Sequence, residues 1–419
     1  MPYDVVIRGT SEVLRVSGSP RDPAEVALAP LPGAALAIAQ ERIAYLGPER
    51  DLPPDAVGPS TRVIDAGGGF AGPGFVDPHT HLVFAGERSR EFELRNRGAT
   101  YLEIAQAGGG IASTVMATRA ASVEELVALA KPRVRRLVEH GVTALEAKSG
   151  YGLSLEHELK MLRAIRRLSE EVPAEIVPTL LCAHAVPEEH RGSRERYVEL
   201  CAKEIVPAAA REGLARACDA FTDQGAFTVA ETRAILGAAR DAGLELRLHA
   251  DQLASIGAVD LAAELGARCV DHLEQVTGAG IAALARADVS AVLIPTSTLF
   301  LRMRPYAPGR KLRDAGVNVA LGTNLNPGSA MSESVPLALG LACLENGLSP
   351  AEAYWAFTRG AAIALGIPGG RLEVGGPADV VVFSCPSYRH LPYHLGINHA
   401  RLVLRRGRVV AENELPQCE

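Results

Sequence analysis

Short apolar runs alternate with longer amphipathic segments through the middle of this 419-residue chain. Eight runs are predicted to be strands: Gly74–Val76, Thr143–Ala147, Glu175–Cys182, Ala217–Thr222, Glu245–His249, Cys269–His272, Ala291–Pro295 and Val317–Gly322. The segments between them have helical patterns, at Val123–Glu139, Leu155–Glu170, Glu195–Glu212, Val229–Ala242, Ile256–Leu265, Gly280–Ala287 and Ser334–Asn346. Strands that alternate with helices predict a parallel sheet, because parallel neighbours need crossover connections. Eight such units over roughly 300 residues predict a closed (β/α)8 barrel of the α/β class.

The two ends of the chain have a different pattern. Residues 1–70 hold short strand-like pieces between Gly and Pro turns, at Tyr3–Arg8, Ala35–Ile38, Arg42–Tyr45 and Arg62–Asp65. Residues 369–419 hold similar pieces, at Asp379–Phe383, Arg401–Leu404 and Arg408–Ala411. Neither end has enough apolar alternation to form its own core. We therefore predict one small β-sandwich built from both termini, which flanks a barrel of residues 71–368.

Composition excludes several classes of protein. Hydrophobic residues make up 47% of the chain and charged residues 22%, which is typical of a globular protein and not of a disordered one. The net charge of −6 gives no support for nucleic-acid binding. No window of about 18 uninterrupted apolar residues predicts a membrane span, and the first residues lack the pattern of a secretory signal. The seven scattered cysteines contain no CxxC pair, which indicates a soluble protein of the reducing cytoplasm.

Histidines stand at the predicted carboxyl ends of four different strands. The first strand is followed by His79 and His81, whose imidazoles point the same way because they are two residues apart on an extended segment. His184, His249 and His272 end the third, fifth and sixth strands. Five of the eleven histidines are therefore expected at one rim of the barrel, where barrels of this kind carry their active sites. Imidazoles that converge in this way predict a metal site.

Six segments of the chain resemble the imidazolonepropionases of the amidohydrolase superfamily. They read GFVDPHTHLVFAGERSREF, EAKSGYGL, LCAHAVP, LHADQL, VDHLE and LGTNLNPGS, and the similarity covers almost the whole chain. The HxH entry to the barrel is shared by all amidohydrolases, whereas the stretches around Arg88, Tyr151 and Asn326 are specific to imidazolonepropionases. The resemblance implies a metal-dependent hydrolase that opens 4-imidazolone-5-propanoate to N-formimidoyl-L-glutamate in histidine degradation.

The resemblance also implies roles for particular residues. His79, His81 and His249 match the family's metal ligands, and Asn324 stands where the family has an aspartate as final ligand. The substrate-contacting positions of the family correspond to Arg88, Tyr151, His184, Gln252, Asn326, Gly328 and Ser329. The implied cofactor is one zinc or iron ion, since three nitrogens and one oxygen suit either metal. The implied partners are a small-molecule substrate and a second copy of the chain in a homodimer.

The residue types agree with hydrolysis of a cyclic amide. A bound metal lowers the pKa of water from about 15.7 to near 7 and polarises a carbonyl. Attack by water gives a tetrahedral oxyanion, and we expect His272 or His184 to stabilise it. Arg88 offers a planar two-pronged donor for the substrate's carboxylate. The alternative for Arg88 is a surface ion pair with Glu87 or Glu91.

Three further positions carry expectations of their own. Tyr151 lies in a Gly-flanked loop, which is a usual place for a binding residue, although simple packing is the alternative. Gln252 cannot take a proton, so we expect it to hydrogen-bond the substrate ring. Lys148 follows the second strand, whereas binuclear relatives carry a modified lysine on the fourth. We therefore expect one metal ion and a Lys148 that pairs with a carboxylate.

Asn324 is the departure from the family with the largest chemical consequence. An asparagine amide brings neither charge nor useful basicity, and the loss of a general base typically costs about 10²–10⁴ in rate. Three explanations stay open: a substitution introduced to trap a ligand, a natural variant in which His272 transfers the proton, or a barrel that binds without turnover. His272, His184 and Asn324 are thus the catalytic candidates. The alternative functions are a deaminase or other amidohydrolase of a related heterocycle, and a silent ligand-binding barrel.

Overall fold

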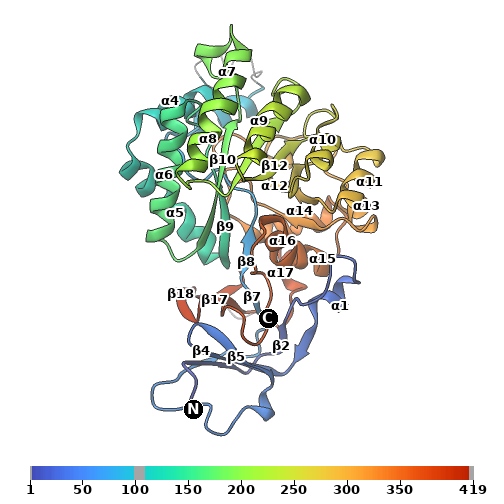
Figure 1. Ribbon diagram of the computed structural model, residues 1–419. Helices are drawn as coiled ribbons and strands as arrows, with labels where there is room; N and C mark the ends of the chain where they lie inside the picture. The colour runs from blue at the N-terminus through green and yellow to red at the C-terminus, as the bar shows by residue number, and fades with distance from the viewer. Residues whose placement is uncertain (1, 99–108, 415–419) are drawn as a thin grey trace.

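The computed structural model describes residues 2–98 and 109–414, which form a barrel and a smaller β-sandwich (Figure 1). Eight parallel strands form the barrel in the order of the chain. They are β8 (Phe75–Asp77), β9 (Val142–Lys148), β10 (Glu175–Ala183), β11 (Ala217–Thr222), β12 (Glu245–Ala250), β13 (Cys269–His272), β14 (Ser290–Leu293) and β15 (Val319–Leu321). The predicted α/β barrel is confirmed, and each predicted strand overlaps an observed one.

The barrel closes between its first and last strands through side chains as well as backbone. Thr323 Oγ1 donates to Asp77 Oδ2 at 2.6 Å, and the Thr323 amide donates to Asp77 Oδ1 at 3.1 Å. Just beyond the strand ends, the amide of Asn324 donates to the carbonyl of His79 at 2.9 Å. The segment after β8 and the segment after β15 are therefore neighbours at one rim of the barrel.

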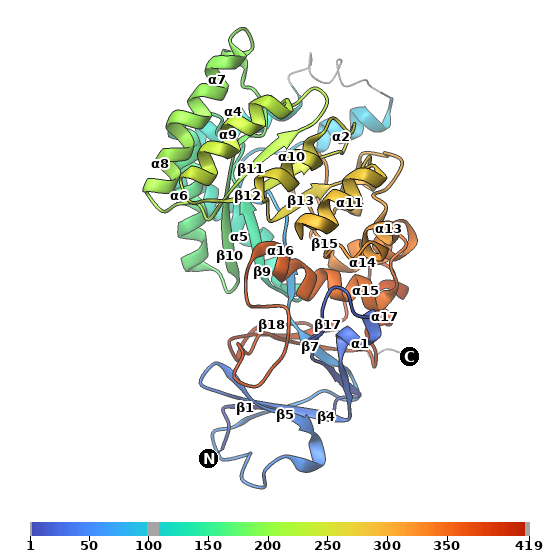
Figure 2. The ribbon, with the colours of Figure 1, turned by 45° about the vertical axis from the view of Figure 1, so that its right-hand side comes forward.

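Helices cover the outside of the barrel between successive strands, as Figure 2 shows for α9, α10 and α11. The helices before and within the first half of the barrel are α2 (Ser89–Asn96), α4 (Ile111–Ala120), α5 (Val123–Glu139), α6 (Leu155–Glu171), α7 (Arg194–Leu200), α8 (Val206–Arg211) and α9 (Val229–Asp241). The others are α10 (Ala258–Leu265), α11 (Gly278–Ala287), α12 (Pro295–Phe300), α13 (Gly309–Asp314), α14 (Val335–Leu344), α15 (Pro350–Trp355) and α16 (Ala361–Leu365). Among the described helices, none is both long and apolar enough to cross a bilayer.

Two elements differ from the sequence-based expectation because of prolines. The segment Glu195–Glu212 is not one helix but α7 and α8 joined by a π-helical turn, Cys201–Ile205. Pro207 lacks an amide hydrogen, so the α-helical bond to the carbonyl four residues earlier cannot form and the turn widens. The seventh barrel strand ends at Leu293, because Pro295 is the first residue of α12.

The sandwich draws its strands from both ends of the chain. One sheet has the order β5-β4-β1-β6 and the other β18-β17-β16-β7-β2-β3. The strands are β1 (Val5–Arg8), β2 (Glu12–Leu14), β3 (Pro30–Pro32), β4 (Ala34–Ala39), β5 (Arg42–Pro48), β6 (Arg62–Asp65), β7 (Ala71–Pro73), β16 (Val380–Phe383), β17 (Ala400–Arg405) and β18 (Arg408–Glu412). Because β7 runs antiparallel to β16 and leads directly into β8, the sandwich lies at the amino ends of the barrel strands. Their carboxyl ends therefore lie at the far side of the barrel.

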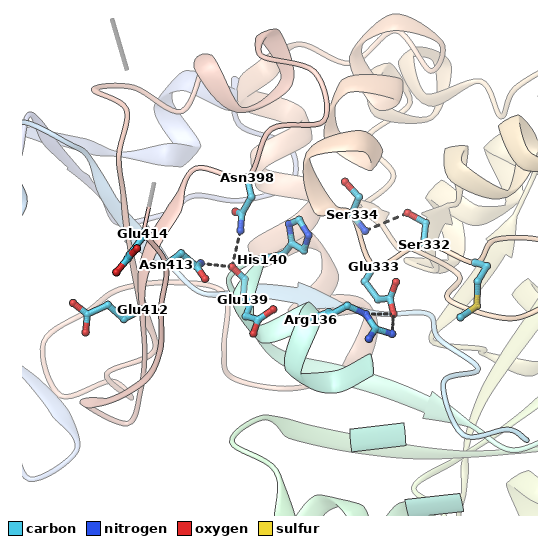
Figure 3. A pocket seen from close by; sticks show the side chains of 11 residues that line it. Arg136, Glu139, His140, Ser332, Glu333, Ser334, Asn398, Glu412, Asn413 and Glu414 are labelled. Atoms are coloured by element: carbon cyan, nitrogen blue, oxygen red, sulfur yellow. Dashed lines mark hydrogen bonds and ion pairs between the residues drawn. The ribbon is translucent and has the colours of Figure 1, made fainter. Parts of the chain in front are cut away.

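A polar hollow of about 600 Å³ lies at the seam between barrel and sandwich (Figure 3). The side-chain amides of Asn398 and Asn413 each donate to the carbonyl of Glu139, at the end of α5, at 2.8 Å. Arg136 pairs with Glu333 at 2.5 Å on the barrel side. These contacts hold the C-terminal strands against the barrel, and the residues predicted for the active site line a different cavity.

Candidate active site

A cavity of about 810 Å³ opens at the carboxyl ends of the barrel strands. Its wall contains every residue predicted to contact substrate, namely Arg88, Tyr151, His184, Gln252, Asn326, Gly328 and Ser329. His81, His249, His272 and Asn324 also line it. The residues selected at separate strand ends therefore meet in a single cavity.

Imidazole nitrogens from three strand ends meet at this cavity. His79 Nε2 lies 3.2 Å from His81 Nε2, and His249 Nε2 lies 3.4 Å from the same His81 atom. Ligands of a tetrahedral ion with bonds of 2.0–2.1 Å stand roughly 3.3 Å apart, so both separations fit one shared ion. His272 joins this cluster, because ligand atoms of His79, His249 and His272 lie within 4.8 Å of one another. The donor set suits a divalent metal ion.

Buried carboxylates orient two of these imidazoles. His79 Nδ1 lies 2.6 Å from Asp271 Oδ2, and His249 Nδ1 lies 3.0 Å from Asp219 Oδ2. A hydrogen on each Nδ1 leaves Nε2 with a bare lone pair that points toward His81. Bare lone pairs at such short separations repel one another unless a cation lies between them. The orientation of the rings therefore suits the binding of a metal ion.

Burial keeps the first-strand imidazoles neutral. Burial, together with the nearby Lys148 and neighbouring histidines, holds the pKa of His79 well below its usual range. Burial and the adjacent His184 have the same effect on the pKa of His81. A neutral imidazole is the form that binds a metal ion, so neither ring would need to lose a proton first.

Lys148 pairs with carboxylates, as the sequence predicts. Its Nζ lies 2.6 Å from Asp219, 2.8 Å from Glu146 and 3.2 Å from Asp271, and all four side chains are fully buried. Burial alone would lower the pKa of Lys148, but the three carboxylates raise it above its usual range, so the side chain is an ammonium ion. Glu146 also forms an ion pair with the buried Arg247.

Arg88 lies in the cavity wall, and its guanidinium group pairs with Glu91. Its Nε and Nη2 donate to the two carboxylate oxygens of Glu91 at 2.8 and 2.5 Å. The bidentate hydrogen bonding that was expected with a substrate carboxylate is therefore made with Glu91. Arg88 nevertheless lines the cavity. A methyl group on Gly328 would lie 2.2 Å from Arg88 Nη1, so a larger residue there would push the guanidinium aside.

Glu158 holds the loop that carries Tyr151. Its Oε1 accepts hydrogen bonds from the amides of Gly152 and Leu153, both at 2.8 Å, and its Oε2 accepts one from the amide of Gly150 at 3.2 Å. Tyr151 is 2% exposed, and burial raises the pKa of its phenol above the usual range. The phenol is therefore a neutral hydrogen-bond donor at the cavity wall.

His184 stacks on His81, with ring centroids 5.0 Å apart. Its Nδ1 lies 3.0 Å from the carbonyl of Gly150, which fixes the hydrogen on Nδ1. Burial lowers the pKa of His184 to about 3. The ring is therefore neutral and presents Nε2 as a hydrogen-bond acceptor.

Asn324 lies in a small network of amides and hydroxyls. Its Oδ1 accepts from Asn326 Nδ2 at 2.9 Å, and its Nδ2 donates to Ser329 Oγ at 3.2 Å. Its backbone is left-handed, with φ of +56°, a conformation that asparagine tolerates better than most residues. The network holds Asn324 at the cavity wall, with its carboxamide already engaged by neighbours.

The carboxylates behind the histidines were not predicted as part of the site. Asp219, Asp271 and Glu146 each stand in a strand that is almost entirely buried, and that was the available signal, because a buried acid needs a partner. Asp223 was not predicted either; it accepts a hydrogen bond from the backbone amide of Gln252 at 2.7 Å and so positions that loop. The cavity residues Arg191, Arg194 and Gln224 were missed as well. Arg191 and Gln224 lie in loops and Arg194 is the first residue of α7, so no period in the sequence marks them.

Comparisons with known proteins agree with this site. The model of the Amidohydrolase family matches residues 96–411. The chain is 68% identical over 416 residues to an imidazolonepropionase of Myxococcus xanthus (strain DK1622), with 99% of each chain covered. It is 48% identical over 416 residues to an imidazolonepropionase of Symbiobacterium thermophilum, with 98% of each chain covered.

Similar solved structures support the fold. The 5-methylcytosine deaminase from Klebsiella pneumoniae has a TM-score of 0.75 at 16% identity, with 99% of each chain covered. The guanine deaminase of E. coli has a TM-score of 0.70 at 18% identity and covers 98% of this chain and 100% of its own. These identities are too low to say more than that the architecture is shared, whereas the sequence relatives match from end to end. The chain therefore belongs to the imidazolonepropionase family of amidohydrolases.

Proposed function

We propose that this protein hydrolyses 4-imidazolone-5-propanoate to N-formimidoyl-L-glutamate, a step of histidine degradation, with one zinc or iron ion. The observation that carries the proposal is the meeting of Nε2 atoms from His79, His81 and His249 beside a cavity lined by Arg88 and Tyr151. Relatives named imidazolonepropionase at 68% and 48% identity support the same substrate.

We assign His79, His81 and His249 as the metal ligands, with Asn324 as the neighbouring oxygen donor. When bound, the metal lowers the pKa of water and polarises the ring carbonyl of the substrate. Asp271 and Asp219 keep the Nε2 atoms of His79 and His249 free of hydrogen, as the short Nδ1 contacts support.

Arg88 and Tyr151 are proposed to bind the two ends of the substrate. The guanidinium of Arg88 faces the cavity beside Gly328 and supplies the positive charge that the propionate group requires. Tyr151, a neutral donor, suits an oxygen of the ligand. The cavity wall also carries the side chains of Gln252, Asn326 and Ser329. These side chains are uncharged and can donate and accept hydrogen bonds.

We assign proton transfer to His272 and ring binding to His184. His184 carries its hydrogen on Nδ1, so its Nε2 accepts a hydrogen bond and cannot donate one to an oxyanion. His272 lines the same cavity, and its backbone φ of +81° is the strained conformation that functional sites often contain. His272 therefore takes the proton of the attacking water and returns it to the leaving ring nitrogen.

The decisive experiment combines product analysis with metal analysis. Freshly prepared 4-imidazolone-5-propanoate should yield N-formimidoyl-L-glutamate with the metal-loaded protein, lose this product after chelation and regain it with zinc or iron. Elemental analysis should give one ion per chain. If neither this chain nor its Asn324→Asp form gave the product with metal bound, the proposal would be contradicted. Ammonia release from another heterocycle, unaltered in Arg88→Ala, would favour a deaminase instead.

We also propose that two copies of the chain form a homodimer in the cytoplasm. Leu344, Tyr393 and Leu395 are 71%, 87% and 50% exposed around α14 and the short helix α17 (His390–Tyr393), an apolar patch of the kind that interfaces cover. Light scattering should give twice the chain mass of 44.2 kDa, and Tyr393→Glu should halve it.

A further inference from the structure

A cage of three buried carboxylates lies behind the histidine cluster. Glu146 from β9, Asp219 from β11 and Asp271 from β13 are all 0% exposed. Together with the imidazoles they make two further ligand groups whose atoms lie within 4.8 Å of one another: His79, Glu146 and Asp271, and Asp219, His249 and Asp271. Groups rich in carboxylate oxygen suit magnesium, calcium or manganese. The ligands for a second cation are therefore present.

The position that such a cation would take is occupied by the ammonium of Lys148. Its Nζ contacts all three carboxylates, at 2.6 Å for Asp219, 2.8 Å for Glu146 and 3.2 Å for Asp271. The remaining Oδ1 atoms of Asp219 and Asp271 are buried and have no hydrogen-bond partner among the described residues. The ammonium is thus the cation on which these carboxylates converge.

The charges of the cage match one divalent ion. Three carboxylates face two side-chain cations, Lys148 and Arg247, and Arg247 is paired with Glu146. Without Lys148, two negative charges would stay buried and uncompensated, since three anions would face one cation. Buried charge of that size is strongly unfavourable unless a cation balances it.

We infer that Lys148 is a resident cation that takes the place of a second divalent metal and so keeps this centre mononuclear. Lys148 shares Asp271 Oδ2 with His79 and Asp219 Oδ2 with His249, so it also positions the carboxylates that orient these two rings. The inference concerns the same site as the proposed function and rests on it for the first metal. The second metal position uses other ligand atoms, so the number of ions bound there can be measured independently of the first.

The test is a count of manganese ions in the full-length protein. Wild type, Lys148→Ala and Lys160→Ala are stripped with chelator, refolded from urea with excess manganese, desalted and analysed for metal. Lys160 is the matched control, because its Nζ donates to the backbone carbonyls of Arg119 and Ala121 and to no carboxylate among the described residues. We expect one manganese per chain in wild type and Lys160→Ala, and two in Lys148→Ala, with a spin-coupled electron paramagnetic resonance spectrum only in the latter.

The difference between variants separates this inference from the proposed function. Lys148→Ala that retains no more manganese than wild type overturns the inference, and so does Lys148→Ala that fails to fold at any manganese concentration. If wild type retained no manganese and Lys148→Ala retained one ion per chain, the proposed metal centre would be contradicted. The inference about Lys148 would still hold. His81 belongs to neither carboxylate group, so Lys148→Ala combined with His81→Ala should retain the additional ion.

Discussion

His79 Nδ1 and Asp271 Oδ2 lie 2.6 Å apart, and both side chains are fully buried. The contact joins the first barrel strand to the sixth and decides which nitrogen of the ring carries a hydrogen. Asp271 does not line the cavity, yet it directs the Nε2 lone pair of His79 toward His81, which does line it. The chemistry of the site therefore depends on carboxylates one layer behind it.

Asp271→Asn should weaken metal binding about 10- to 100-fold, the usual effect of losing a carboxylate behind a metal-bound histidine. The substitution keeps the shape of the side chain but removes the charge that fixes His79. Competition with a chromophoric zinc chelator measures the affinity. Asp288→Asn is the control, because Asp288 is exposed and its left-handed φ of +55° suits asparagine. Equal affinities in the two variants would contradict the role of Asp271.

Asn324→Asp should raise kcat by at most about 10²–10⁴, the range that a positioned general base contributes, because His272 already transfers the proton and the aspartate would be a second base. An aspartate would add a negative charge and a basic oxygen at the cavity wall, beside the cluster of histidines. The measurement is kcat for 4-imidazolone-5-propanoate at full metal occupancy. Asn96→Asp, an exposed position on α2, should leave kcat unchanged. An unchanged kcat in Asn324→Asp would show that His272 alone suffices for proton transfer.

The barrel was predictable because its signal extends over the whole middle of the chain. Strands such as β11 and β13 coincide with the predicted runs Ala217–Thr222 and Cys269–His272, since a buried parallel strand is almost continuously apolar. The strands β2, β3 and β7 were not predicted, because they show neither alternation nor the apolar run that marks the equally short β8 and β15. Their pairing across the two termini depends on contacts between distant residues.

The candidate site was predictable where residues follow a barrel strand. His81, His249 and Asn324 line one cavity because parallel strands all end at the same rim. The ion pair of Arg88 with Glu91 was an alternative that the sequence already offered, and a carboxylate partner was expected for Lys148. That three acids converge on Lys148 could not be read in the same way. Two of these acids, Asp219 and Asp271, lie far from Lys148 in the sequence, so only the fold brings them to it.

Arg88→Met should raise KM for 4-imidazolone-5-propanoate about 10- to 100-fold with a smaller change in kcat. A hydrogen bond to a charged group contributes about 1.5–3 kcal/mol, and a lost contact with the distant carboxylate acts mainly on binding. Gly328→Ala should raise KM by less, because its methyl group would displace Arg88 Nη1 without removing the charge. Arg97→Met is the control, since Arg97 is 74% exposed and pairs with Glu93. A KM that stays constant in Arg88→Met would exclude a carboxylate contact.

Glu352 should stabilise the fold above acidic pH and lose this effect as pH falls. It accepts two hydrogen bonds from Arg310, at 2.8 and 2.9 Å, and one from the amide of Ser349 at 2.8 Å. Burial raises the pKa of Glu352, but these bonds outweigh burial and bring the pKa below its usual value of 4.5. A folded-state pKa below the unfolded one gives stability that is present above the unfolded value and disappears as pH falls through the folded value.

Glu352→Gln should therefore lower the free energy of unfolding by roughly 1 kcal/mol at pH 7, the usual size of such a pair and helix cap. The difference from wild type should shrink toward zero by about pH 3, because the wild-type carboxyl is then protonated as well. Urea unfolding at a series of pH values measures both quantities. Glu170→Gln, at an exposed position of α6, should match wild type throughout. A difference that grows as pH falls would mean that Glu352 is protonated in the folded protein and that Arg310 does not hold it as a carboxylate.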